Sequence, residues 1–432
     1  MDLKFQEFFK EQGYTQQTII QQTVYQPLKA GESILGLAPT GSGKTLAYTL
    51  PLLENVVPAQ GVQLMIVAPS QELAAQLATV IRRWAALKEL KVTTLIGGAN
   101  VKRQLEKLKK KPEVIVGTPG RMLELADAKK LKLHHLHAVV FDEADELLTD
   151  ETLTACRALL AHAPGRQVQL SFFSATTADI FQQLEHWFGG VPIKTYDVRA
   201  QDQTQGGEVT HYLLETPTRK RTEALRRLAH LEGFSALVFF KQVAVLEEVA
   251  AKLDYQKVPV ATLEGQSRQQ ERQRSLEQLR QGKIKLLLTT DVAARGLDIQ
   301  QLPAVVNYDL PADITIYIHR VGRTGRMGAQ GAVINLGNEH VLRTFRQLLR
   351  AGGYEPVQGE LFGGKLLKAN EVAAKSELKS PLDRTSKNVK PRTSKPVKMD
   401  NSVSLKKKHK GHKKRKRDQL NKGKRRVSKK IQ

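Results

Sequence analysis

The feature that most constrains the fold is an alternation of short apolar runs with longer amphipathic segments, which occurs twice along the chain. Such alternation is typical of βαβ units and therefore of parallel sheets covered by helices. We predict an α/β fold with two successive parallel-sheet domains. The predicted strands are 34–38, Val62–Val67, Val92–Ile96, Val114–Val116, Ala138–Phe141 and Val168–Phe173, then Val209–Leu214, Ala236–Phe240, Val258–Leu263, Ile284–Thr289, Ala304–Tyr308 and Ala332–Leu336.

Polar segments set the predicted domain boundaries. The pattern lapses after the first series of runs and restarts at Val209, so we predict a first domain over 1–200, a linker over 201–208 and a second domain over 209–364. After Gly363 and Gly364 the periodicity is lost and Lys, Ser, Pro and Asn dominate. We predict that residues 365–432 form a disordered basic tail.

The positive charge is concentrated in this tail. Residues 365–432 hold 25 Lys and Arg against 5 Asp and Glu, whereas the preceding residues hold 43 against 38. A dense polycation predicts a nucleic-acid partner; an anionic membrane surface and a partnerless solubilising tail are the alternatives.

Several classes of protein are excluded by composition. No apolar run approaches the roughly 18 residues of a membrane span, and the first residues lack the apolar core of a secretion signal. Cys156 is the only cysteine, which rules out an intramolecular disulfide and cysteine-cluster metal sites. We therefore expect a cytoplasmic protein with no membrane partner.

A glycine-rich loop between a predicted strand and a predicted helix suggests phosphate binding. Its residues are Ala38, Pro39, Thr40, Gly41, Ser42, Gly43, Lys44 and Thr45. The glycines free backbone N–H groups to surround phosphates, Lys44 can reach the β- and γ-phosphates, and the Thr45 hydroxyl can hold Mg²⁺. Ala38 stands where the generic loop has glycine, and an ordinary glycine-rich turn is the alternative.

Two acidic residues follow the predicted strand Ala138–Phe141. At the carboxyl end of a sheet strand, Asp142 can coordinate the Mg²⁺ held by Thr45, and Glu143 can orient and deprotonate an attacking water. The alternative is an acidic helix N-terminus without catalytic meaning.

Three arginines recur at a spacing of three residues near the end of the second domain. Arg320, Arg323 and Arg326 would share one face of a helix, where their charges repel unless an anion such as phosphate joins them. A solvated basic face is the alternative.

The ordered set of motifs resembles the DEAD-box RNA helicase family, over about Phe5 to Leu336. The resemblance implies two tandem RecA-like domains, ATP and Mg²⁺ as cofactors, and RNA as partner. It also implies that Gln21 recognises adenine, that Tyr14 or Phe5 stacks on it, and that Ser174, Ala175 and Thr176 couple ATP hydrolysis to RNA through His319. Arg323 and Arg326 look like arginine fingers, and Gly296 and Asp298 belong to the nucleotide-binding motif beginning at Thr289.

The same resemblance implies an RNA-binding set. It comprises Pro69, Gly98, Thr118, Arg121, Gln269, Arg272 and Thr290. The chain departs from the family pattern at Gln17, at Ser70 and Gln71, and at Glu264. Gln71 replaces a cation on the RNA-facing side.

The resemblance therefore implies an ATP-dependent RNA helicase that contacts mainly the RNA backbone and separates short duplexes locally. Ribosome assembly, with ribosomal precursor particles as partners, and RNA turnover are the expected settings. A DNA-directed translocase and an RNA-binding clamp or scaffold with weak ATPase activity are the alternatives.

Overall fold

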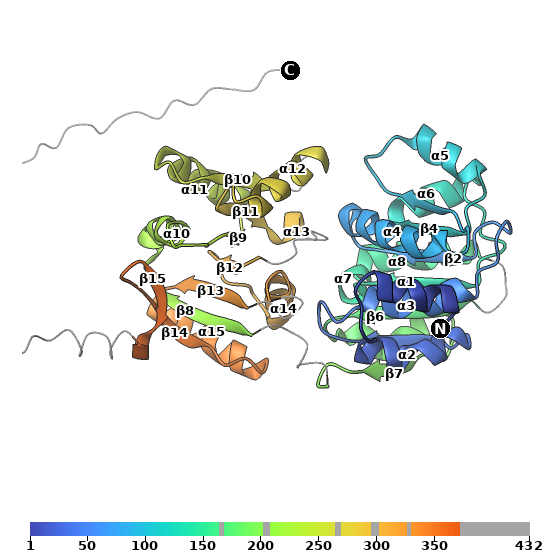
Figure 1. The fold of residues 1–432 in the computed structure, drawn as a ribbon, viewed down its shortest axis with the longest axis horizontal. Helices are drawn as coiled ribbons and strands as arrows, with labels where there is room; N and C mark the ends of the chain where they lie inside the picture. The colour runs from blue at the N-terminus through green and yellow to red at the C-terminus, as the bar shows by residue number, and fades with distance from the viewer. Residues whose placement is uncertain (164–167, 202–207, 264–268, 295–301, 326–329, 372–432) are drawn as a thin grey trace, which may run out of the picture. The chain divides into compact units, whose positions relative to one another are not determined.

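The computed structural model describes residues 1–163, 168–201, 208–263, 269–294, 302–325 and 330–371. Within these ranges the strands form two sheets, each covered by helices on both faces, as the alternating pattern predicts (Figure 1). Both sheets belong to the same compact unit of the chain. None of the helices in the described ranges combines the length and apolar character that a bilayer crossing requires.

The first sheet is parallel throughout and has the strand order β3-β4-β2-β5-β6-β1-β7. Its strands are β1 (Ile34–Leu37), β2 (Leu64–Val67), β3 (Val92–Leu95), β4 (Val114–Gly117), β5 (Ala138–Asp142), β6 (Gln169–Ser174) and β7 (Lys194–Asp197). Because β6 lies between β1 and β5, the carboxyl ends of these three strands are neighbours. This arrangement brings together the segments after Leu37, Asp142 and Ser174.

Side-chain alternation divides the core of this domain between the two faces of the sheet. Ala138 and Val140 of β5 pack in one cluster, whereas Val139 and Phe141 pack in the other. The first face is covered by α1 (Leu3–Glu11), α2 (Ile19–Lys29), α3 (Lys44–Glu54) and α4 (Gln71–Ala86). The second carries α6 (Pro119–Asp127), α7 (Ala144–Leu147), α8 (Asp150–Ala161), η1 (Asp179–Gln183) and α9 (Leu184–Trp187). The remaining helix, α5 (Val101–Lys109), follows β3.

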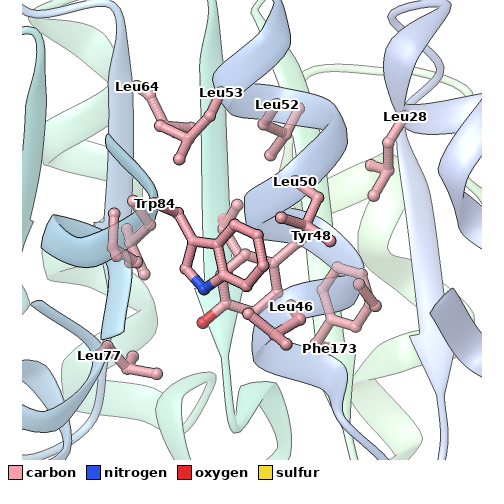
Figure 2. Packing of buried hydrophobic residues seen from close by; sticks show 14 of the residues in the cluster. Leu28, Leu46, Tyr48, Leu50, Leu52, Leu53, Leu64, Leu77, Trp84 and Phe173 are labelled. Carbon is pink, nitrogen blue, oxygen red and sulfur yellow. The ribbon is translucent and has the colours of Figure 1, made fainter. Parts of the chain in front are cut away.

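The α3 helix is buried along most of its length, because apolar side chains occupy nearly every position after Thr45. Tyr48 and Leu50 lie in the cluster with Trp84 of α4 and Phe173 of β6 (Figure 2). A fully buried side chain of this size contributes roughly 1.5–3 kcal/mol relative to an exposed one. This packing fixes α3, and with it the loop that leads into α3.

The second sheet repeats the strand order of the first. Its order is β10-β11-β9-β12-β13-β8-β14-β15, which matches the first sheet strand for strand up to β14. The strands are β8 (Val209–Glu215), β9 (Ala236–Phe240), β10 (Val260–Leu263), β11 (Leu286–Thr290), β12 (Ala304–Asn307), β13 (Gly331–Gly337), β14 (Val357–Phe362) and β15 (Lys365–Lys368). Only β15 is antiparallel to its neighbour among the paired strands described.

Helices cover both faces of the second sheet as well. One face carries α10 (Arg221–Ala229), which follows η3 (Thr218–Lys220), and α11 (Val243–Tyr255). The other carries α12 (Gln269–Arg280), α13 (Asp291–Ala294), α14 (Ile314–Val321) and α15 (Glu339–Ala351).

The structure adds edge strands that the sequence pattern does not reveal. β7 and β15 expose much of their surface and alternate too little in polarity to produce an apolar run. β15 extends the second sheet to Lys368, so ordered structure continues beyond the predicted boundary at Gly364. The expected linker falls largely, and the expected tail almost wholly, outside the described residues.

Candidate nucleotide and RNA site

The loop between β1 and α3 takes a conformation that requires glycine at two positions. Gly41 and Gly43 have φ angles of 87° and 85°, in the left-handed region that side chains disfavour. A Cβ on Gly43 would also lie 2.5 Å from Nε2 of Gln21. The backbone of the predicted phosphate loop is thus shaped by the residues expected of it.

The side chain of Lys44 lies inside this loop and is hydrogen-bonded to its backbone. Its Nζ donates hydrogen bonds to the carbonyl oxygens of Ala38 and Pro39, at 2.8 and 3.0 Å. The ammonium group also lies near enough to Asp142 to oppose the rise in the pKa of that carboxyl. The ammonium group is therefore held inside the loop, beside the acidic end of β5.

Asp142 is a buried carboxylate with both oxygens engaged. Oδ2 accepts a hydrogen bond from the hydroxyl of Tyr48 at 3.0 Å, and Oδ1 accepts one from the N–H of Glu143 at 3.1 Å. Burial and then the Glu143 charge raise the pKa of Asp142 to about 6, against the opposing effects of Lys44 and these hydrogen bonds.

Glu143 shows two further traits of a functional residue. Its φ of 51° places a non-glycine side chain in the left-handed region, which costs of order 1–3 kcal/mol. Its Oε2 is buried and has no hydrogen-bond partner in the described part of the chain. The buried Asp142 carboxylate, the unpartnered Glu143 Oε2 and the Thr45 hydroxyl, which is hydrogen-bonded to Tyr48, are oxygen donors of the kind that suits a hard dication such as Mg²⁺.

A hydrogen-bonded series joins the end of β6 to α14. Ser174 Oγ accepts from the N–H of Thr176 at 3.0 Å, and the Thr176 hydroxyl donates to Oδ2 of Asp145. Nε2 of His319 lies 3.1 Å from the same Oδ2. The structure thus brings the predicted coupling residues Ser174, Thr176 and His319 together, with Ala175 between the first two, through a carboxylate that the sequence interpretation did not single out.

The charges of this series reinforce one another. Burial tends to lower the pKa of His319, but the hydrogen bond and charge of Asp145 outweigh it and the net pKa is raised. Burial tends to raise the pKa of Asp145, but the contacts with His319 and Thr176 lower it overall. The pair therefore favours an imidazolium–carboxylate ion pair.

Gln21 connects α2 to the phosphate loop. It is buried; its Oε1 accepts the N–H of Thr18 at 3.1 Å, and its Nε2 donates to the carbonyl of Gly43 at 3.2 Å. Tyr14 is 40% exposed and available for stacking, with one face against Phe9 at a centroid distance of 4.9 Å. Phe5, the other aromatic considered for stacking on adenine, is fully buried against Trp84, so that alternative was wrong.

The predicted three-arginine helical face is not formed. α14 ends at Val321 with Gly322 as its C-cap, so Arg323 lies beyond the helix. Arg320 is buried and binds Asp291 through two nitrogens, at 2.7 and 2.8 Å, and the Asn307 side chain at 2.7 Å. Its charge is therefore used within the second domain, because a carboxylate is already in place to neutralise it.

The loop after α14 approaches the phosphate loop closely. A Cβ on Gly322 would lie 2.9 Å from side-chain atoms of Thr40. Arg323, 7% exposed, lines a pocket of about 150 Å³ together with Asp145 and His319. The predicted residues Gly296, Asp298 and Arg326 lie outside the described residues.

The predicted RNA residues of the first domain follow β2, β3 and β4. Pro69, Gly98, Thr118 and Arg121 thus lie at the same carboxyl edge as the nucleotide residues but on the other half of the sheet. Arg121 pairs with Glu124 at 2.8 Å, and its Nη1 is buried without a hydrogen-bond partner in the described part of the chain. An unsatisfied guanidinium nitrogen suits an anionic ligand.

In the second domain, the candidate RNA residue Arg272 contacts the first domain. Its Nη1 lies 3.0 Å from Oε1 of Glu72 on α4, and its Nη2 donates to the carbonyl of Ala293. Thr290 ends β11, and the side chain of Gln269 lies outside the described atoms. Gln71 stands where the family has a cation. Its side chain lies over the turn at Gly97, and a Cβ added to Gly97 would be 3.0 Å from Nε2 of Gln71.

Sequence reasoning missed Tyr48, Glu72, Asp145 and Asp291. Two of them had a usable signal: Tyr48 follows Lys44 by one helical turn, and Asp145 ends the acidic motif of residues 142–145, which begins with Asp142 and Glu143. Glu72 and Asp291 act through partners distant in sequence, which only the fold brings near.

Comparisons with known proteins agree with this architecture. Residues 18–184 match the family model for the DEAD/DEAH box helicase, and residues 220–328 match that for the helicase conserved C-terminal domain. The chain is 39% identical over 366 residues to the probable ATP-dependent RNA helicase YfmL of Bacillus subtilis, covering 84% of this chain and 95% of that protein. It is 35% identical to the DEAD-box ATP-dependent RNA helicase CshC of Bacillus cereus, covering 86% and 95%.

Among solved structures, the S. cerevisiae Dbp5 protein bound to RNA and ADP BeF3 is similar, with a TM-score of 0.71 and 27% identity over 83% of this chain and 93% of that one. The fold and the site together define a two-domain, nucleotide-binding enzyme of the helicase class. More specifically, the chain belongs to the family of DEAD-box ATP-dependent RNA helicases.

Proposed function

We propose that this helicase uses ATP hydrolysis to separate short RNA duplexes locally and to remodel RNA–protein complexes. The observation that carries this proposal is the series His319–Asp145–Thr176, which joins α14 of the second domain to the end of β6 in the first. A structural change at the bound nucleotide can therefore alter this contact between the domains, and with it the binding of any RNA that both domains hold.

The nucleotide roles follow from the side chains at the carboxyl edge of the first sheet. Lys44 binds the β- and γ-phosphates, and Glu143 accepts a proton from the attacking water. Thr45 and Asp142 would hold Mg²⁺, which when bound neutralises phosphate charge. Gln21 and Tyr14 recognise adenine, and the bond from Gln21 to Gly43 supports a link between base recognition and loop shape.

The second domain completes the site from the other side. Arg323 and Arg326 stabilise charge in the transition state, as arginine fingers do. Since neither domain alone surrounds the triphosphate, ATP favours the closed form, and hydrolysis removes that preference. RNA bound by both domains favours closure too, so ATP and RNA strengthen each other's binding.

The RNA-binding set recognises backbone rather than sequence. Pro69, Gly98, Thr118 and Arg121 in the first domain, with Gln269, Arg272 and Thr290 in the second, suit contacts to phosphates and 2′-hydroxyls. The strongly basic residues 365–432 support large structured RNAs, such as ribosomal precursor particles in the cytoplasm, as partners.

The test compares ATP hydrolysis without nucleic acid, with single-stranded RNA, and with DNA of equal length and sequence. We expect stimulation by RNA well above that by DNA. Equal stimulation by both would favour a DNA-directed translocase, and RNA binding without stimulation would favour a clamp or scaffold; either result contradicts the proposal.

A further inference from the structure

The hydroxyl of Tyr48 is hydrogen-bonded to the residues of the predicted metal site. Tyr48 is fully buried, and its ring packs against Phe173 at a centroid distance of 5.1 Å (Figure 2). Its hydroxyl donates to Oδ2 of Asp142 at 3.0 Å, and the Thr45 side chain is hydrogen-bonded to the same tyrosine. One side chain therefore contacts both residues expected to hold Mg²⁺.

The packing of this ring does not require a hydroxyl. Tyr48 is surrounded by apolar side chains of α3, α4 and β6. A phenylalanine ring would fill the space between them equally well. Burying a hydroxyl costs free energy unless it is hydrogen-bonded, and here the bond goes to a carboxylate. The feature that the hydroxyl adds is thus its contact with Asp142 and Thr45.

Asp142 has little freedom to reorient because of this contact. The backbone N–H of Glu143 holds Oδ1, and Tyr48 holds Oδ2 from the opposite element, α3. Without the hydroxyl, the carboxylate would keep one local hydrogen bond to the next residue and could rotate about its side-chain torsions. A ligand set held in place before binding loses less entropy when the ion arrives.

We propose that Tyr48 is a positioning residue that holds Asp142 and Thr45 in the arrangement needed for Mg²⁺-dependent nucleotide binding. This inference rests on the proposed function, in that Thr45 and Asp142 are the metal-holding pair. Tyr48 itself touches neither phosphate nor water in the reaction. Its effect is on how strongly Mg²⁺ enhances nucleotide affinity.

Tyr25 provides a matched control in the same domain. It is also a buried tyrosine whose hydroxyl donates to a carboxylate, that of Glu54, but it lies on α2 away from the phosphate loop. Tyr48→Phe and Tyr25→Phe therefore each remove a hydroxyl that donates a hydrogen bond to a carboxylate. Only the first touches the predicted metal site.

The experiment measures the affinity of the full-length protein for fluorescently labelled ADP, with Mg²⁺ and with EDTA, alongside thermal unfolding without nucleotide. We expect Tyr48→Phe to bind ADP in EDTA like wild type but to lose roughly tenfold of the enhancement by Mg²⁺, since a hydrogen bond to a charged group is lost. Raising the Mg²⁺ concentration should restore the affinity. Tyr25→Phe should keep the full enhancement.

Two outcomes would overturn the inference. If Tyr48→Phe unfolds at a lower temperature yet keeps the wild-type Mg²⁺ enhancement, the hydroxyl is purely structural. If ADP affinity falls equally with Mg²⁺ and with EDTA, the tyrosine shapes the loop and not the metal pair. Because the measurement uses neither RNA nor hydrolysis, it stays separate from failure of the helicase proposal.

Discussion

Nε2 of His319 lies 3.1 Å from Oδ2 of Asp145, and this contact joins α14 of the second domain to the acidic motif of the first. The same carboxylate oxygen accepts the hydroxyl of Thr176, and Glu146 lies 3.7 Å from Nδ1 of His319. The imidazole of His319 thus contacts two carboxylates, those of Asp145 and Glu146, which lie within three residues of Glu143 in the sequence. A buried ion pair at this place makes the contact between α14 and the first domain depend on the protonation of His319.

The first prediction concerns the pH dependence of this contact. The pKa of His319 is raised above its ordinary 6.5 despite burial, because Asp145 bonds the charged form. A raised pKa in the closed form means that the stabilisation is complete below about pH 6.5 and is lost as pH rises through the raised value. We expect RNA-stimulated ATP hydrolysis to decline over that alkaline range, and His319→Gln to hydrolyse more slowly with a flatter profile. An unchanged pH profile in the variant would show that His319 is not the titrating group.

The second prediction concerns Glu143, whose buried Oε2 has no hydrogen-bond partner in the described part of the chain. Glu143→Gln should lower kcat by about 10²-fold or more, because the amide cannot accept the proton of the attacking water. Affinity for ATP and RNA should persist, since Lys44 and Asp142 remain. Hydrolysis near the wild-type rate in the presence of RNA would remove Glu143 from the catalytic set.

The third prediction separates the roles of three neighbouring arginines. Arg323→Ala and Arg326→Ala should each lower kcat sharply, by up to about 10³-fold, with ATP affinity in the first domain retained. Arg320→Ala should instead lower the free energy of unfolding by about 3 kcal/mol, because the Asp291 carboxylate and Oδ1 of Asn307 lose their hydrogen bonds to Arg320. This loss lies near the lower end of what breaking a buried ion pair costs, because the Asp291 side chain is 35% exposed and remains partly solvated. A raised KM with intact kcat in the finger variants would indicate ground-state binding alone.

The fourth prediction concerns the basic residues after the second sheet. Because β15 runs to Lys368, the deletion should begin at Val372 and not after Gly364. The truncated protein should keep RNA-stimulated ATP hydrolysis but bind RNA more weakly and with a shallower salt dependence. Each neutralised phosphate contributes about −0.7 to the log–log slope, so loss of about six contacts changes it by roughly four units.

A variant that replaces the lysines and arginines of 406–417 by glutamine is the control for chain length. It should reproduce much of the change in slope if the charges act by releasing counterions. Superimposable salt slopes for the full-length and truncated proteins would leave protein docking or solubility as the role of this segment.

Strand positions could be predicted from the sequence wherever a strand is buried on both faces. Ala236–Phe240 has the same limits in the structure as in the pattern, and most other interior strands differ only by a residue or two. β7 and β15 could not be predicted, because edge strands with exposed side chains carry no apolar run. The same strand order in both sheets also appears only in the fold, since it depends on crossovers and not on local pattern.

For the site, contiguous motifs were the predictable part. Lys44 and Asp142 were singled out from residue type and position, and Thr176 and His319 from the resemblance to the DEAD-box family. The structure brings the segments of all four together. The error at Arg320 has a physical cause: spacing alone cannot show that a helix ends at Val321 or that Asp291 already neutralises the charge. Pairs such as Glu72 with Arg272 depend on residues far apart in sequence, so no local pattern carries them.

The most direct test of the account is strand separation of a short RNA duplex, followed in parallel for wild type, His319→Gln and Lys44→Ala with ATP or with ADP. We expect rapid separation by wild type with ATP alone, none by Lys44→Ala, and strongly reduced separation by His319→Gln with ATP affinity retained. Wild-type separation that proceeds equally with ADP, or a His319→Gln variant that separates strands as fast as wild type, would contradict the coupling of ATP hydrolysis to RNA through His319 and Asp145.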